Sequence, residues 1–303
     1  MKKILPLLVI LIILVGILVE KDKIYETYNT FILKQKIENI KAPVTNEYYR
    51  ENKFNYVQTT DDYVPDNKQE LMNLIYTIIS SGQTTYTFYC PTDYKDCIKD
   101  VNDIAENQSI LSDINNFVHP YNSFKHIVTK YDNTREVTIT YTKNYTEEQI
   151  IEVNNRINYL FKKLYRPKDS VAVNLRRFHD YVANHAKYDS ERADTNEFNY
   201  YSDIAYGPLI EGYALCGGYS DAIALYLDKM NITNYKVSSN DHVWNAIKIN
   251  NKWYHLDLTW DDPITDTGQN YLIHDYFLIT TQQLEKKAQE QHQFDKTIYS
   301  ELQ

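Results

Sequence analysis

The chain has 303 residues, enough for one large domain or two ordinary ones. Aspartate and glutamate number 41 against 32 lysine and arginine residues, which gives a formal net charge of −9. This acidic balance argues against a nucleic-acid-binding protein, which would carry a basic patch or stripe.

The first twenty residues have the pattern of a membrane anchor. Lys2 and Lys3 precede an uncharged, nearly all apolar run from Ile4 to Val19. As a helix this run would be roughly 24 Å long, a little shorter than a hydrocarbon core of about 30 Å. No small-residue cleavage site follows it. We therefore expect residues 1–20 to be an uncleaved signal anchor, with a cleaved signal peptide as the alternative. The short basic N-terminal tail favours a cytoplasmic start, so the body should lie outside the cytoplasm.

Residues 21–168 contain no motif that carries chemistry. Residues 21–68 are charged and rich in tyrosine and asparagine, which is typical of a stalk or spacer, with a helical patch at 25–40. Residues 69–168 predict a small α+β domain that positions the rest of the chain or contacts a partner. Its expected elements are helices at 69–80, 101–117 and 146–164 and strands at 84–89, 124–131 and 135–142. Thr146 and Gln149 form a capping-box pattern at the start of the last helix.

Three cysteines constrain the redox chemistry. Cys90 and Cys97 are close enough in the chain to form a disulfide in an oxidising compartment, although both could equally be reduced and buried. In either arrangement Cys216 has no cysteine partner, and a catalytic nucleophile likewise needs a free thiol. Three cysteines without paired C-x-x-C spacing argue against structural zinc.

Residues 169–303 predict a second domain. We expect a helix at 171–188, a polar loop at 189–201, a strand at 271–279 and a solvated terminal helix at 281–292. His179 and His185 are six residues apart and do not share a helix face, so they indicate packing and not chelation. Asp261, Asp262 and Asp266 match no calcium loop and favour turns. No metal and no cofactor are predicted.

Cys216 stands at the predicted start of an amphipathic helix. Apolar residues follow at helical spacing: Tyr219, Ala222, Ile223, Tyr226, Leu227 and Met230. Free N–H groups and the positive dipole end at a helix N-terminus stabilise an anion such as a thiolate. Gly217 and Gly218 would let the backbone approach a substrate closely. The alternative is that Cys216 is a small buried hydrophobic residue.

Two alternating runs downstream, at 242–249 and 253–260, predict a β-hairpin with Asn250 and Asn251 in its turn. A two-residue turn pairs Ile249 with Lys252, and this register places His242 and Asp257 on one face, as diagonal neighbours. That face is expected to lie away from the apolar core face of the hairpin. A nucleophile, a base and an orienting carboxylate thus follow in chain order. His255 shares the face by parity and is a second candidate base.

Three blocks carry a resemblance to a known family: GYALCGGYS at 212–220, HVWN at 242–245 and WYHLDLTWDDP at 253–263. Together they resemble the bacterial transglutaminase-like superfamily of papain-fold cysteine enzymes, over roughly residues 170–280. Val243 stands where that family usually has alanine. The resemblance implies an α+β papain-like core, with a Cys-bearing helix packed on an antiparallel sheet that bears His and Asp. It implies Cys216 as nucleophile, His242 as base and Asp257 as its orienting partner, and it names no substrate.

The expected chemistry is attack of Cys216 on an amide carbonyl to give a thioester, followed by hydrolysis, as in a protease or amidase, or by transamidation. The backbone N–H groups of Cys216 and Gly217 are the expected oxyanion donors. Tyr206 and Trp244 are further oxyanion or substrate candidates, with packing as the alternative for Tyr206. The expected partner is a protein or peptide, for instance of the cell envelope. A catalytically silent envelope-binding module and a purely structural anchored protein are the alternatives.

Overall fold

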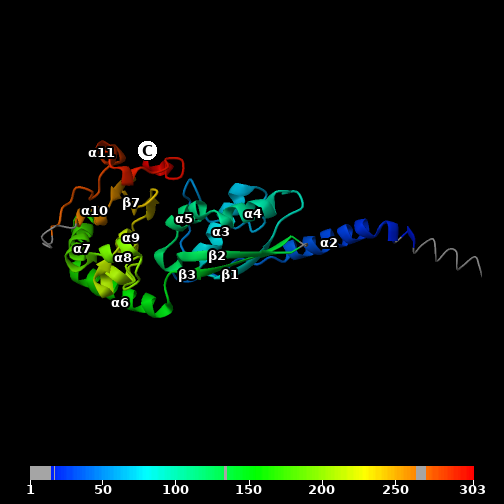
Figure 1. Ribbon diagram of the computed structural model, residues 1–303, viewed down its shortest axis with the longest axis horizontal. Helices are drawn as coiled ribbons and strands as arrows, with labels where there is room; N and C mark the ends of the chain where they lie inside the picture. Colours follow the sequence, from blue (N-terminus) through cyan, green and yellow to red (C-terminus); the bar gives the residue numbers. More distant parts are fainter. Residues whose placement is uncertain (1–14, 17, 133–134, 264–270) are drawn as a thin grey trace, which may run out of the picture.

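The computed structural model describes residues 15–303 except 17, 133–134 and 264–270. The fold is α+β, as the sequence predicts, and helices surround two three-stranded antiparallel sheets (Figure 1). One has the order β1-β3-β2, with β1 at Thr85–Tyr89, β3 at Glu136–Lys143 and β2 at Phe124–Tyr131. The other has the order β6-β7-β8, with β6 at Asn234–Ser238, β7 at Val243–Ile249 and β8 at Lys252–Leu256. Figure 1 shows two units side by side, which we call the N-terminal unit (residues 43–145) and the second unit (residues 146–303).

A long helix, α2 (Lys21–Glu38), projects away from both units (Figure 1). Only its last turns contact the body, through buried Leu33 and a 2.6 Å ion pair from Lys36 Nζ to Glu136 Oε2. No described helix combines the length and the apolar character that crossing a membrane requires. Residues 1–14 and 17 of the expected anchor lie outside the described residues.

The segment after α2 is not the spacer that the sequence predicts. Phe54 and Val57 are buried in the core of the N-terminal unit, and Gln58 N–H donates to the side chain of Asn73 on the helix α3 (Lys68–Ser81). These contacts make residues 43–67 part of the folded body. The spacer interpretation is therefore wrong beyond α2.

The N-terminal unit contains the helices and strands that the sequence predicts between residues 69 and 142, with one helix divided in two. Its elements are α3 (Lys68–Ser81), β1 (Thr85–Tyr89), α4 (Cys97–Glu106), α5 (Gln108–Asn116), η1 (Pro120–Asn122), β2 (Phe124–Tyr131) and β3 (Glu136–Lys143). The single helix predicted at 101–117 is instead two helices, because the side chain of Asn107 accepts from the N–H groups of Ser109 and Ile110 and so caps the start of α5.

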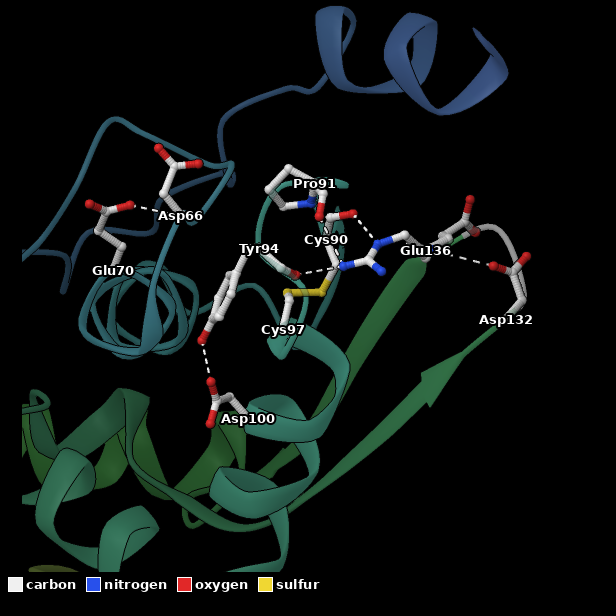
Figure 2. Close-up of a disulfide and its surroundings, with 10 residues drawn as sticks. Asp66, Glu70, Cys90, Pro91, Tyr94, Cys97, Asp100, Asp132 and Glu136 are labelled. Carbon is white, nitrogen blue, oxygen red and sulfur yellow. Dashed lines mark hydrogen bonds between the residues drawn. A yellow bond between two sulfur atoms is a disulfide. The ribbon is translucent and has the colours of Figure 1, made fainter. Parts of the chain in front are cut away.

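Cys90 and Cys97 form a disulfide, with their Cα atoms 5.7 Å apart (Figure 2). Arg135 closes the same loop by donating to the carbonyl oxygens of Cys90, Pro91 and Tyr94 at 2.7–2.9 Å. Tyr94 in turn donates to Asp100 at 2.5 Å. The bridge thus fixes the start of α4 to the end of β1.

The second unit packs one helix, α9 (Cys216–Lys229), against a face of its sheet, and two further helices, α6 (Glu147–Leu164) and α7 (Val171–His185), pack on α9. The sheet consists of β6, β7 and β8. The Thr146–Gln149 capping box is confirmed. Because α6 packs on α7 and α9, it belongs to this unit, and the boundary between the units lies near residue 145 and not at 168.

Short elements complete the second unit. They are β4 (Lys187–Tyr188), α8 (Ser190–Thr195), η2 (Gly207–Glu211), β5 (Tyr213–Ala214), α10 (Leu258–Asp261), α11 (Thr281–Lys286), η3 (Glu290–His292) and η4 (Ser300–Leu302). The strand predicted at 271–279 is reduced, in its described residues, to one bridge between Ile279 and His255. The helix predicted at 281–292 ends at Lys286, and the chain beyond it is partly buried, for instance at His292.

The hairpin has the predicted register, with Ile249 opposite Lys252 and the two turn asparagines at φ of 50° and 65°. Both of its faces are buried, however. Ile247 and Leu256 face the helices, whereas Trp244 and Ala246 face the N-terminal unit and the C-terminal segment. The His242 face therefore lies opposite the face that packs on the helices, as expected, but it is buried against a second core.

Candidate active site

Cys216 is the first residue of α9 and is partly exposed. Leu215 precedes it as N-cap and makes no side-chain cap, so no side chain of the N-cap residue occupies the N–H groups of the first turn. The two following glycines are required by the protein itself. A Cβ on Gly217 would come within 2.7 Å of the Asp203 carbonyl oxygen, and one on Gly218 within 2.3 Å of the Ser202 oxygen. Backbone packing against residues 202–203 is thus a sufficient reason for both glycines, and the close approach of a substrate to them remains a prediction.

His242 and Asp257 meet as the hairpin register predicts. The distance from His242 Nε2 to Asp257 Oδ2 is 2.6 Å, and both side chains are buried. Asp257 is not within a strand, however, because β8 ends at Leu256. Its Oδ1 accepts from Trp260 N–H at 3.2 Å and caps α10, which ends the predicted strand four residues early.

Cys216 lies beside His242: both line the same groove, and the thiol helps to raise the pKa of the imidazole. Nε2 of the imidazole is directed to Asp257, which leaves Nδ1 as the ring nitrogen available to the thiol. Three side chains from three places in the chain thus form one connected line: the start of α9, the residue before β7 and the residue after β8. This is the order of nucleophile, base and orienting carboxylate.

Electrostatics favour a charged imidazole in this line. Burial disfavours the cation, but the Asp257 charge and hydrogen bond, together with Cys216, outweigh burial and raise the pKa of His242 to about 10. Burial likewise opposes ionisation of Asp257, but the His242 charge and hydrogen bonds from His242 and His292 lower the pKa of Asp257 to about 2. The pair is therefore an ion pair across the neutral range.

A second histidine completes the site, and the sequence interpretation missed it. His292 Nε2 lies 2.8 Å from the same Asp257 Oδ2, and its side chain is buried. Gln, Glu and Lys dominate residues 281–292, and this composition predicts a solvated helix there. Local pattern alone gives no signal that one histidine near the end of a polar segment returns to the site.

The site opens into a groove of about 780 Å³. Cys216 and His242 are at its wall together with residues of α5, of the loop before β7 and of the C-terminal segment. Among its charged residues are Asp113, Asp241 and Asp295; Lys236, the one lysine, is paired with Asp221 at 2.8 Å. The N-terminal unit thus contributes one wall of the groove, through α5.

The remaining sequence candidates lie elsewhere. The hydroxyl of Tyr206 donates to Glu152 on α6 at 3.1 Å, away from the groove lining. Trp244 is buried behind His242, with its ring stacked at 5.7 Å, so it packs the base and does not offer a surface to substrate. His255 uses both ring nitrogens, accepting from Trp244 Nε1 at 2.9 Å and contacting Thr281 Oγ1 at 3.0 Å. It has no contact with Asp257 of the kind that a base requires.

Two groups of side chains in the described residues are close enough to hold a metal ion: His242, Asp257 and His292, and separately His179, Asp180 and His274. In each group the imidazole nitrogens are hydrogen-bonded to the carboxylate, which accounts for their proximity. Of the aspartates considered for calcium, Asp261 contacts His179 and Asp262 accepts from Tyr219. Asp266 lies outside the described residues.

No protein-family model matches the chain, and no curated protein matches it. The structure is similar to a crystal structure of a TGase, with a TM-score of 0.34 and 21% sequence identity over 45% of this chain. The matched region spans 44% of that chain, less than half of its length. Function is therefore inferred below from the site itself.

Proposed function

We propose that the protein is a cysteine enzyme of the transglutaminase-like type that breaks amide bonds through Cys216, His242 and Asp257. One observation carries the proposal: a partly exposed thiol at a helix start contacts a buried imidazole that a buried carboxylate holds at 2.6 Å. A silent binding module of the same fold would need none of these three contacts. The purely structural alternative would place Cys216 in the core, whereas it borders a groove.

The reaction follows from the positions of the three groups. His242 takes the thiol proton, and the sulfur of Cys216 bonds to the amide carbonyl carbon. The N–H groups of Cys216 and Gly217 are the proposed donors to the oxyanion. The C–N bond then breaks, and the amine or ammonia leaves with the proton held by His242. Asp257 stabilises the imidazolium throughout and does not itself take the proton. The product at this stage is a thioester on Cys216.

Water or an amine resolves the thioester. Attack by water, with its proton passed to His242, gives a carboxylic acid and the free thiol, which is hydrolysis. Attack by a primary amine gives a new amide, which is transamidation. An open groove of about 780 Å³ suits a segment of polypeptide better than a small enclosed ligand, so we propose a protein or peptide substrate.

The test is to trap the acyl-enzyme. Purified protein is incubated with cell-envelope extract, quenched in acid, digested and examined by mass spectrometry for an acyl group on the peptide that contains Cys216. Cys216→Ala is the matched control, and Asp257→Asn should accumulate the adduct more slowly. Failure to detect any adduct on Cys216, together with an alkylation rate equal to that of an unfolded cysteine peptide, would refute the proposal.

We further propose that the body works outside the cytoplasm, tethered by residues 1–20. The Cys90–Cys97 disulfide supports this location, because such bonds persist in oxidising compartments. Protease added to intact, wall-stripped cells should remove the body. Protection of the body in intact cells, with digestion after lysis, would contradict it.

A further inference from the structure

His292 reaches the site from the far end of the chain. It lies in η3, 35 residues beyond Asp257, and its Nε2 is 2.8 Å from Asp257 Oδ2. The same oxygen is 2.6 Å from His242 Nε2. One carboxylate oxygen therefore accepts from two imidazole N–H groups, while the other accepts from Trp260 N–H.

The surroundings of His292 are aromatic. Its ring stacks on Tyr276, with centroids 4.8 Å apart, and packs against Trp260 at 5.0 Å and Trp244 at 5.1 Å. A phenylalanine would suit these ring contacts equally well. Among the described residues, Nδ1 of His292 has no hydrogen-bond partner although it is buried. Burying a polar nitrogen without a partner costs free energy, so the one bond to Asp257 is the feature that a histidine adds here.

The segment that carries His292 is itself fastened to the site. Gln291 accepts from Trp260 Nε1 at 3.2 Å and donates to Asp241, next to His242, at 3.3 Å. Farther on, the hydroxyl of Tyr299 contacts Ser238 Oγ at 2.9 Å and Asn116 Nδ2 of α5 at 2.8 Å. Figure 1 shows this segment, in red, lying over β7 toward α5. His292 is therefore held in place from both sides.

We propose that His292 is a positioning residue that divides the hydrogen-bonding capacity of Asp257 Oδ2 between two imidazoles and so sets how strongly Asp257 binds His242. A second donor on an anionic oxygen disperses its charge. Each of the two bonds is consequently weaker than one bond alone would be. Without His292, Oδ2 would serve His242 alone, and the His242–Asp257 bond would tighten. The inference rests on the proposed function only in assigning a catalytic purpose to His242.

Two variants separate hydrogen bonding from packing. His292→Phe keeps the aromatic contacts and removes the donor. His292→Gln gives up the ring but presents an amide N–H near the position of Nε2. If the Phe variant does not fold, His292→Leu replaces it, and thermal denaturation of each variant establishes that the fold is retained.

The readout is proton NMR of histidine-¹⁵N-labelled protein at neutral pH, where imidazole N–H groups bonded to a carboxylate resonate far downfield. The wild-type protein should show two such resonances from this site. The resonance lost in both variants belongs to His292, and the one lost in His242→Gln belongs to His242. This assignment separates both from the imidazole N–H groups of His179 and His274, which are bonded to Asp180. We expect the His242 resonance to move farther downfield in His292→Phe and to stay near its wild-type position in His292→Gln.

An unmoved His242 resonance in His292→Phe would overturn the proposal, as would equal shifts in the two variants, which would assign His292 to packing. Alkylation of Cys216 by iodoacetamide in the wild-type protein is measured alongside. A slow, unactivated Cys216 would count against the proposed function, whereas the NMR result would still decide the role of His292. The two failures are therefore distinguishable.

Discussion

Two histidine–aspartate–histidine groups lie in the second unit, and their geometry is nearly the same. In one, His242 and His292 share Asp257 Oδ2 at 2.6 and 2.8 Å. In the other, His179 and His274 share Asp180 Oδ1 at 3.0 and 2.7 Å. The two groups differ in what lies on the remaining ring nitrogens.

In the Asp180 group those nitrogens face other protein groups. His179 Nε2 is 3.2 Å from buried Asp261, and His274 Nδ1 is 3.1 Å from Arg176 Nη2. Asp261 also accepts from Tyr276 N–H, so the group joins α7 to α10 and to the segment after residue 270. In the Asp257 group, His242 instead faces a thiol at the wall of a groove. Similar residues in similar geometry thus hold the fold together in one place and, as we propose, perform chemistry in the other.

The largest expected difference concerns the two aspartates. Asp257→Asn should slow alkylation of Cys216 by iodoacetamide at mildly acidic pH roughly 10- to 10³-fold, because asparagine cannot stabilise the imidazolium by charge. The variant should also lose its imidazolium at lower pH than the wild type, in which the pKa of His242 is about 10. Rates are read from mass-spectrometric labelling across pH.

Asp180→Asn is the matched control and should leave the labelling rate unchanged, since Asp180 does not contact the thiol or His242. His255→Ala should also be far milder than Asp257→Asn. If Asp257→Asn labels like the wild type while His255→Ala abolishes labelling, the assignment of the base is wrong.

The second largest effect should be on stability. His179→Leu fills much of the same volume but leaves Oδ2 of the buried Asp261 carboxylate without its donor, while Oδ1 still accepts from Tyr276 N–H. The loss should cost about 2–4 kcal/mol of unfolding free energy. Burial lowers the pKa of His179, but the Asp180 and Asp261 bonds and charges outweigh it, so the pKa is raised. The stabilisation is therefore fully present below the unfolded pKa of about 6.5 and is lost as pH rises through the folded value. Urea unfolding at several pH values measures both.

Cys216 labelling in His179→Leu should match the wild type under conditions where the variant is folded. A loss of labelling without a loss of stability would mean that the two groups are coupled. The Asp180 group would then not be purely structural.

The sequence predicts some elements and residues of the two histidine–aspartate–histidine groups and not others. Helix α9, the hairpin register and the approach of His242 to Asp257 follow from local periodicity and the two-asparagine turn, and the structure has them. His292 and His274 could not be predicted, because their positions depend on how residues 271–303 fold back over the sheet. Two element ends were also missed. Asp257 ends β8 and Asn107 divides the predicted helix, in each case because the side chain hydrogen-bonds to backbone N–H groups. The alternation of apolar and polar residues does not reveal such bonds. The roles of Gly217 and Gly218 likewise depend on a distant segment at 202–204.

The disulfide should give a smaller, purely structural effect. Replacing Cys90 and Cys97 together by serine opens a short loop, and the chain-entropy model gives a loss of about 2–3 kcal/mol. Arg135 still bonds three carbonyls of that loop, which should keep the loss at the lower end. Chemical denaturation measures the change, and thiol counting on the unreduced wild type should find one free thiol. A count of three free thiols would contradict the bridge.

The smallest expected effect comes from His255, which lies beside the Asp257 group without being part of it. Burial, with the charge of His292, lowers the pKa of His255 to about 3, although Asp257 opposes the shift. A histidine whose folded pKa lies below its unfolded value of about 6.5 binds its proton more readily in the unfolded chain. As pH falls below that value, the unfolded state gains protons and the folded state does not, so stability decreases. Between pH 7 and pH 6 this amounts to about 0.7 kcal/mol.

His255→Asn keeps an oxygen that can accept from Trp244 Nε1, and its side chain cannot titrate. The variant should start less stable, because the Thr281 contact is lost, but its unfolding free energy should fall less steeply over that interval. If wild type and variant lose stability in parallel, His255 is not held neutral by its surroundings. Its assignment as a packing histidine, distinct from the base His242, would then be wrong.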